Sequence, residues 1–299
     1  MSETQGPVLK HIFESIRIGH LLLRNRIMMA PITTGLESQG NYEELANFYS
    51  QIASGGTGLI TVGGFVYSRL GAHHWRQQRF NRKHHISSQK KLTDAIHSKG
   101  SFAVFQLIHY GAEAQHLFAM NSSTMSKEDG SRIAWKMPRS IIKKTIGQCI
   151  KTALLAKEAN YDGVELDACR QRLINSFATP GLNTRKDDWG ETSENRFRMA
   201  LEIVKGIRQQ AGDEFLIGAR ISLLDFHRFG KSWEETVQFA HDLEKAGVNY
   251  FTFDSGSTTC RFRLRTGSPR KMRGFRSSKC SVKKFLFRSF LVITYPPQN

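Results

Sequence analysis

The chain has 299 residues, of which 39% are hydrophobic and 23% are charged, as expected for a soluble globular protein. It lacks both a run of ~18 apolar residues that could cross a membrane and an N-terminal secretory signal, so we expect a cytoplasmic protein. The net charge of +17 does not indicate a nucleic-acid partner. The segment from Arg261 to Asn299 holds 11 of the 43 basic residues and none of the 26 acidic ones, which leaves +6 for the first 260 residues.

Up to about Ser257, short apolar runs alternate with segments of helical pattern, which is typical of βαβ units around a parallel sheet. Apolar residues at three- and four-residue steps predict a helix from Phe197 to Ile207. Ser232 and Glu235 form a capping signature for another helix, which ends before Gly247. Six runs are expected to be strands: Ile27 to Ala30, Leu59 to Gly63, Phe102 to Ile108, Gly163 to Asp167, Phe215 to Ile221, and Tyr250 to Phe253.

Six βα units favour an incomplete (β/α)₈ barrel over residues 1–257, because eight such units close a barrel in ~250 residues. An open doubly wound sheet would also accommodate six parallel strands, but no G-x-G-x-x-G turn follows the first run. Residues 258–299 form a basic, irregular tail in which Phe285 to Tyr295 is the only strand candidate. We expect this tail to be disordered or to be an out-of-frame translation. The out-of-frame hypothesis would be refuted if the other two reading frames of the DNA encoded no barrel-like strands.

The four cysteines are far apart and show no C-x-x-C spacing, so we expect buried thiols and neither a metal site nor a disulfide framework. Ligands of barrels bind where the loops after the strands converge. Glycines there allow close backbone approach, amides donate and accept, and an arginine supplies a permanent cation, a set that suits a planar heterocycle with carbonyl and ring nitrogen atoms. Each residue alone also has a purely structural explanation. The residues at the strand ends are Thr33, Thr34, Gly63, Gly64, Gln106, His109, Asp167, Arg170, Arg220 and Asp225.

Five motifs occur in order between about Val8 and Ser257: N-R-I-M-M-A-P-I-T-T-G-L-E, F-Q-L-I-H-Y-G, Y-D-G-V-E-L, L-I-N-S-F-A-T-P-G-L-N-T-R-K-D-D-W-G-E-T-S-E-N-R-F-R and G-A-R-I-S-L-L-D. Together they resemble the old yellow enzyme family of NADH:flavin oxidoreductases and NADH oxidases, and most of all its 2,4-dienoyl-CoA reductase branch. The resemblance implies a barrel that binds FMN without a covalent bond. It also implies that NAD(P)H reduces the flavin, which then reduces an activated alkene such as an enoyl compound.

By position, the resemblance implies that the backbone of Ala30, Pro31 and Ile32 passes beside the flavin ring, with Thr33 near its N5 edge. Gly64 would lie under the ring and Gln106 would bond its pyrimidine edge. Arg220 would stabilise the negative charge that gathers near N1 and O2 when the flavin is reduced.

The chain departs from the family where a proton donor is expected. The family usually has a tyrosine in the context G-Y-L-[IL]-N-x-F, whereas Q-R-L-I-N-S-F places Arg172 there, and an arginine does not release its proton near neutral pH. The pair that binds the substrate carbonyl corresponds to Asp167 and Arg170; an arginine can polarise a carbonyl, but a carboxylate has no donor. The basic residue after the third strand is replaced by Ala112. The last two barrel units are not recognisable, so the chain resembles a C-terminally truncated member.

Three functions follow. The preferred one is an FMN-dependent oxidoreductase with a small-molecule substrate, and its alternative is a degenerate member that binds flavin weakly or not at all. A third, in which the basic tail binds nucleic acid, is least favoured because a charge run is usually a solvated segment. We expect no membrane partner, and the sequence makes no prediction about oligomeric state.

Overall fold

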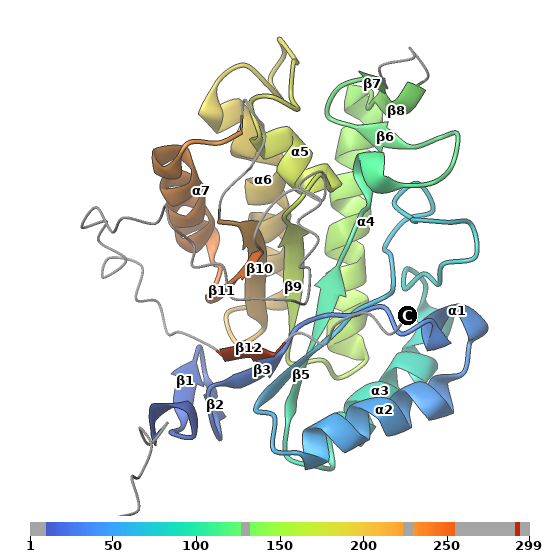
Figure 1. Cartoon of the computed structure of the whole chain (residues 1–299), viewed down its shortest axis with the longest axis vertical. Coiled ribbons are helices and arrows are strands. Elements are labelled where there is room, and N and C mark those ends of the chain that lie inside the picture. Colours follow the sequence, from blue (N-terminus) through green and yellow to red (C-terminus); the bar gives the residue numbers. More distant parts are fainter. Residues whose placement is uncertain (1–9, 127–131, 224–229, 255–290, 294–299) are drawn as a thin grey trace, which may run out of the picture.

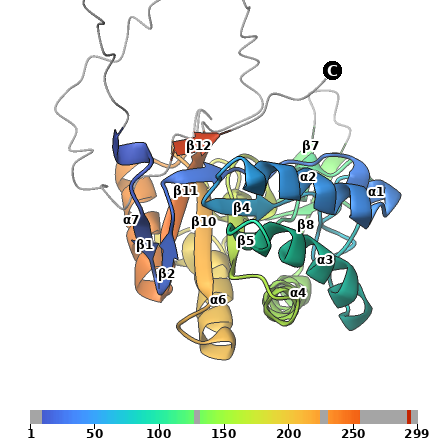
Figure 2. The same ribbon diagram turned by 90° about the horizontal axis from the view of Figure 1, so that it is seen from below.

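The computed structural model of the chain describes residues 10–126, 132–223, 230–254 and 291–293. Its central element is a parallel sheet of seven strands in the order β11, β10, β9, β5, β4, β3, β12. The sheet curls, and helices cover its outer side (Figures 1 and 2). The strands are β3 (Ile27–Met29), β4 (Leu59–Val62), β5 (Phe102–Leu107), β9 (Gly163–Ala168), β10 (Leu216–Ser222), β11 (Tyr250–Asp254) and β12 (Leu291–Ile293).

All six predicted strands are confirmed, each with its ends within one residue of the expected range. β12 lies inside the strand candidate of the tail and pairs in parallel with β3, with Leu291 opposite Ile27. The other residues of 255–299 lie outside the described residues, as does Asp225, so the expectation of a disordered or out-of-frame tail stays a prediction.

The outer face of the sheet and the helices form the larger core. Successive strand side chains point to opposite faces, so Phe105 packs outward against the helices whereas Val104 points inward. The helices are α1 (Leu36–Gln39), α2 (Tyr42–Ser54), α3 (Ile86–His97), α4 (Arg139–Glu158), α5 (Leu173–Ala178), α6 (Ser193–Ala211) and α7 (Trp233–Ala246), with short 3₁₀ turns η1 (Lys10–Ile12), η2 (Lys83–His85) and η3 (Gly111–Glu113). In the part of the chain that the structure describes, none of them is long and apolar enough to span a membrane.

Local sequence signals account for the two predicted helices. In α7 the Ser232 hydroxyl accepts from the Glu235 amide at 3.1 Å while the Glu235 carboxylate accepts from the Ser232 amide at 3.1 Å, so the predicted capping box is confirmed. In α6 the predicted apolar stripe is buried, and Phe197 packs against Phe239 of α7 with ring centroids 4.7 Å apart.

A hairpin that sequence reasoning missed fills the lower end of the inner face. Its strands are β1 (Ile16–Ile18) and β2 (Leu21–Leu23), and it forms a second apolar cluster with inward residues such as Leu59 and Leu216. Because helices cover one face and this hairpin the other, the open doubly wound alternative, with helices on both faces, is excluded for this part of the chain. The fold is an incomplete (β/α)₈ barrel.

A second unpredicted sheet lies between β5 and α4. It consists of β6 (Met120–Asn121), β8 (Arg132–Lys136) and β7 (Met125–Ser126), in that order. It stands above the carboxyl ends of the barrel strands (Figure 1), next to the loops that form the candidate site.

Candidate functional site

The upper half of the inner face is polar, in contrast to the apolar lower half. Gln106 of β5 lies opposite Glu165 of β9, and one layer higher Asp167 lies opposite Arg220 of β10, which in turn neighbours Thr252 of β11. All five side chains are buried or nearly so. Parallel pairing therefore brings residues from four strands to one edge of the sheet, as the sequence predicted for Gln106, Asp167 and Arg220.

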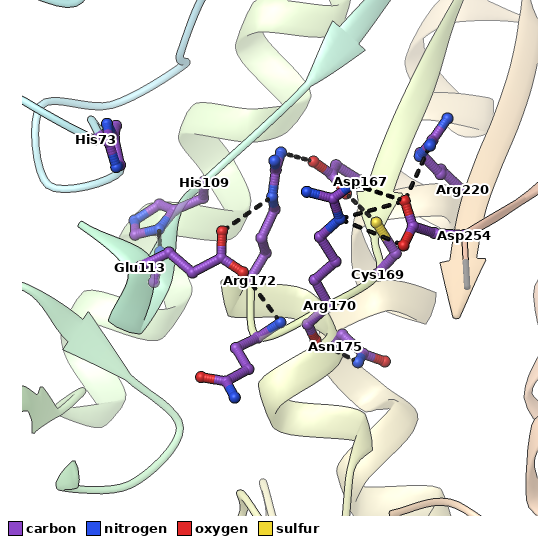
Figure 3. A network of polar contacts seen from close by, with 12 residues as sticks. His73, His109, Glu113, Asp167, Cys169, Arg170, Arg172, Asn175, Arg220 and Asp254 are labelled. Carbon is purple, nitrogen blue, oxygen red and sulfur yellow. Dashed lines mark hydrogen bonds and ion pairs between the residues drawn. The ribbon is translucent and has the colours of Figure 1, made fainter. Parts of the chain in front are cut away.

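Asp254, the last residue of β11, holds two of the predicted arginines. Arg170 donates to its carboxylate from Nε and NH2 at 3.1 to 3.3 Å, and Arg220 donates from NH2 at 3.0 Å (Figure 3). Burial would raise the pKa of Asp254, but the charges and hydrogen bonds of the two arginines outweigh it and hold that pKa below its ordinary value. Asp254 is thus a carboxylate that fixes both guanidinium groups.

The guanidinium of Arg172 is also held by carboxylates. Its NH1 pairs with Asp167, its Nε lies 3.6 Å from the Glu113 carboxylate, and its guanidinium carbon lies 4.7 Å from the centroid of the Tyr110 ring. Asp167 also accepts a hydrogen bond from Nε2 of Gln106 at 3.4 Å. The expected catalytic-site residues Asp167, Arg170 and Arg172 therefore do lie together, with Arg172 between Glu113 and Asp167 in Figure 3.

Glu165 is the titratable group buried most deeply on the inner face. Its Oε2 accepts from the Thr252 hydroxyl at 3.0 Å, and its side chain has 0% exposure. Burial raises the pKa of Glu165 to about 7, although the nearby charge of Arg220 opposes this. The carboxyl group therefore changes charge near neutral pH, directly beneath the layer that holds Arg220.

Three buried polar atoms of the inner face have no hydrogen-bond partner among the described residues: NH1 of Arg220, Oε1 of Glu165 and Oγ1 of Thr61. Buried polar groups are nearly always satisfied, so NH1 of Arg220, in the upper polar layer at the ligand-binding end of the barrel, indicates a polar ligand. Glu165 lies one layer deeper, and Thr61 lies opposite Val104 of the apolar cluster. A buried cationic donor fits a carbonyl oxygen, which a flavin pyrimidine ring carries.

The ends of β3 and β4 form a closely packed wall. A Cβ at Gly63 would lie 2.8 Å from the Ile32 carbonyl oxygen, so these two backbones touch. Gly64 has φ 85° and faces the buried carboxylate of Glu37, which would lie 2.6 Å from a Cβ there. Ala30 is buried, Pro31 and Ile32 are half-buried, and Thr33 is exposed.

The second hydroxyl of the T-T pair has a structural role. Thr34 donates from its amide and its hydroxyl to Oε1 of Glu37 at 3.1 and 3.0 Å. Sequence reasoning did not single out Glu37, although T-x-x-E is a capping signature that could have found it. Asp254, Glu165 and Glu113 were also missed; the first two follow from the strand-end rule and the period of two.

His109 is a packed histidine. Its Nδ1 accepts from the Gly111 amide at 3.2 Å, and its ring lies 5.7 Å from that of Tyr67. Burial, with a smaller contribution from His116, lowers the pKa of His109 to about 3, so the ring is neutral. The polar segment after β9 is held by its own ion pairs: Arg185 forms a bidentate pair with Asp187 at 2.7 and 2.9 Å.

Residues 11–280 match the model of the NADH:flavin oxidoreductase / NADH oxidase family. A metal reductase of Desulforamulus reducens is 31% identical over 250 residues, 82% of this chain and 37% of the relative. An NADH oxidase of Thermoanaerobacter brockii is 30% identical over 254 residues, 82% of this chain and 39% of the relative. The structure of a 2-naphthoyl-CoA reductase superposes with a TM-score of 0.77 at 26% identity, over 83% of this chain and 41% of that one. The chain spans less than half the length of each of these three proteins.

Proposed function

The chain belongs to the NADH:flavin oxidoreductase / NADH oxidase family, and we propose that it is an FMN-dependent oxidoreductase that passes a hydride from NAD(P)H through the flavin to an activated alkene. The acceptor is a small molecule, and the compartment is the cytoplasm. One observation carries the proposal: NH1 of Arg220 is buried without a partner among the described residues. A buried cationic donor is costly to leave unsatisfied, and a flavin carbonyl would satisfy it.

The remaining polar groups support the same ligand. Gln106 can bond the pyrimidine edge with its amide, since its neighbour Asp167 takes only one of its two N–H donors, at 3.4 Å. Any side chain at Gly64 would clash with Glu37, so the backbone itself forms the wall at this position. Thr33, exposed beyond β3, and the backbone of Ala30 to Ile32 would line the other edge. When bound, FMN would supply the two-electron chemistry that no amino-acid side chain provides.

The protein's own part is electrostatic. Arg220 places a fixed cation where negative charge would gather, and it needs no reorganisation because Asp254 already holds it at 3.0 Å. Arg170, which Asp254 also holds, is 36% exposed and can turn a free donor towards an acceptor carbonyl. The negative charge of Asp167 is balanced by its ion pair with Arg172, so the pair adds little net charge to the site.

One observation favours the alternative of a degenerate member. Arg172 stands where the family has its proton-donating tyrosine, and its guanidinium is bound to Asp167. In this alternative, the ion pair blocks acceptor binding and flavin is held weakly or not at all.

The visible spectrum of the purified protein separates the two. Bound oxidised flavin that is bleached by NADH or NADPH supports the oxidoreductase, and recovery of the colour on adding an enone supports the alkene acceptor. A colourless protein that does not take up added FMN would refute the proposal and leave the degenerate member.

A further inference from the structure

Reduction of an alkene requires a proton as well as a hydride. The hydride and its electron pair, supplied by NAD(P)H, form a new C–H bond at one carbon of the double bond. The π electrons move to the other carbon, which takes up a proton from an acid in the site. If the proposed function is correct, the protein must contain such an acid, and Arg172 cannot be it.

Most polar groups of the site can be excluded as the proton donor. Arg170, Arg172 and Arg220 remain protonated at any relevant pH, and Asp167 and Asp254 are carboxylates that accept hydrogen bonds from arginines.

The more deeply buried groups are also unsuitable as proton donors to the substrate. Glu165 lies two residues before Asp167 on β9, a layer ~7 Å deeper, and is fully buried. His109 is neutral and enclosed, and a neutral imidazole does not give up its last proton. The Cys169 thiol points inward and donates to Asp167 at 3.1 Å.

Two acids next to Arg172 remain, Glu113 and Tyr110, and only Tyr110 carries a phenol, the chemical group of the missing donor. It follows β5 directly before η3, and its half-buried ring lies under the guanidinium of Arg172 at 4.7 Å. The centroid of the His73 ring lies 4.9 Å from that of Tyr110. The backbone holds this arrangement, because the Leu173 amide donates to the His109 carbonyl at 3.1 Å and ties the segment after β5 to the start of α5.

We propose that Tyr110 is the proton donor of the reaction, with Arg172 as the cation that stabilises the tyrosinate left behind. The two residues thus divide what the family tyrosine does alone: the phenol comes from the end of β5 and the charge from the position after β9. The Asp167 and Glu113 carboxylates hold the Arg172 guanidinium in place over the Tyr110 ring. The guanidinium would face the negative charge left on Tyr110 after its proton has passed to the substrate, and solvent would then return a proton.

The test is Tyr110→Phe, which keeps the ring that contacts Arg172 and His73 and removes only the hydroxyl. Bleaching of the flavin by NADH and its reoxidation by oxygen are expected to stay within 2-fold of wild type. Reoxidation by 2-cyclohexen-1-one, followed by stopped flow, is expected to fall at least ~100-fold, the usual loss when a general acid is removed. Tyr42→Phe, on α2, is the matched control.

The rival acid is Glu113, because burial raises its pKa although Arg172 opposes this. A 100-fold loss in Glu113→Gln with Tyr110→Phe unchanged would overturn the proposal. The proposal would also be overturned if the flavin of the wild-type protein were bleached by NADH but not reoxidised by the enone. A colourless wild-type protein is a different failure, since it refutes the proposed function itself.

Chemical modification gives a readout that does not depend on turnover. Tetranitromethane nitrates accessible tyrosines, and mass spectrometry locates the modified residues. A saturating concentration of the saturated ketone cyclohexanone is expected to protect Tyr110 at least 5-fold and to leave Tyr42 unaffected. Equal nitration of Tyr110 with and without the ketone would show that it lies outside the acceptor site.

Discussion

Replacement of Glu165 by glutamine tests the electrostatics of the inner face most directly. The pKa of Glu165 is raised by burial from its ordinary value of 4.5 to about 7. Between these values the folded chain holds a proton that the unfolded chain has released. Stability therefore falls as pH rises through this window, and at ~1.4 kcal/mol for each pH unit the loss amounts to about 3 kcal/mol above pH 7.

Glu165→Gln removes this penalty because an amide does not ionise, while its oxygen can still accept from Thr252. The difference in unfolding free energy between Glu165→Gln and wild type should therefore shift by about 3 kcal/mol in favour of the variant between pH 4 and pH 8. A constant offset from the new amide group does not affect this shift.

Urea denaturation of the flavin-free chain, followed by circular dichroism at four pH values across the window, measures the difference. Glu158→Gln, on the exposed side of α4, is the matched control for loss of a surface carboxylate. Parallel pH profiles for Glu165→Gln and wild type would refute the reasoning, since they would mean that the carboxyl group is equally protonated in the folded and unfolded chain.

Three further predictions concern the site and its frame. Gln106→Ala and Arg220→Ala should each weaken FMN binding ~10- to 100-fold in a fluorescence titration, and unchanged affinity in both would contradict the placement of the flavin. Asp254→Asn leaves the Arg170 and Arg220 guanidinium groups without their carboxylate and should lower the unfolding free energy at pH 7 by about 3 kcal/mol. Because the pKa of Asp254 is lowered, this loss should persist down to about pH 3.8 and disappear only below it. Ser232→Ala should cost ~1 kcal/mol by removing a helix cap, whereas Ser232→Asn should cost a few tenths; equal losses would argue against the cap.

The strands and the two helices could be predicted because their signals are local. A buried strand such as Phe102–Leu107 is an apolar run of its own, and the cap of α7 lies within four consecutive residues. The β1–β2 hairpin carries no comparable signal. Its strands have three residues each, and they are stabilised by packing against Leu59 and Leu216 rather than by their own pattern.

By itself, the sequence determined the six strands and their parallel order. It also determined which polar side chains lie at one edge of the sheet, because a period of two and the βα repeat fix which residues face inward at a strand end. These residues are Gln106, Asp167, Arg170, Arg172 and Arg220. Only the tertiary structure decided what those side chains do there. Arg170 and Asp254 are 84 residues apart, and Glu165 and Thr252 are 87 apart, so nothing in either neighbourhood predicts the pairing. The charges, the proton on Glu165 and the position of Tyr110 beneath Arg172 arise when curling of the sheet excludes water and brings distant groups within a few ångströms.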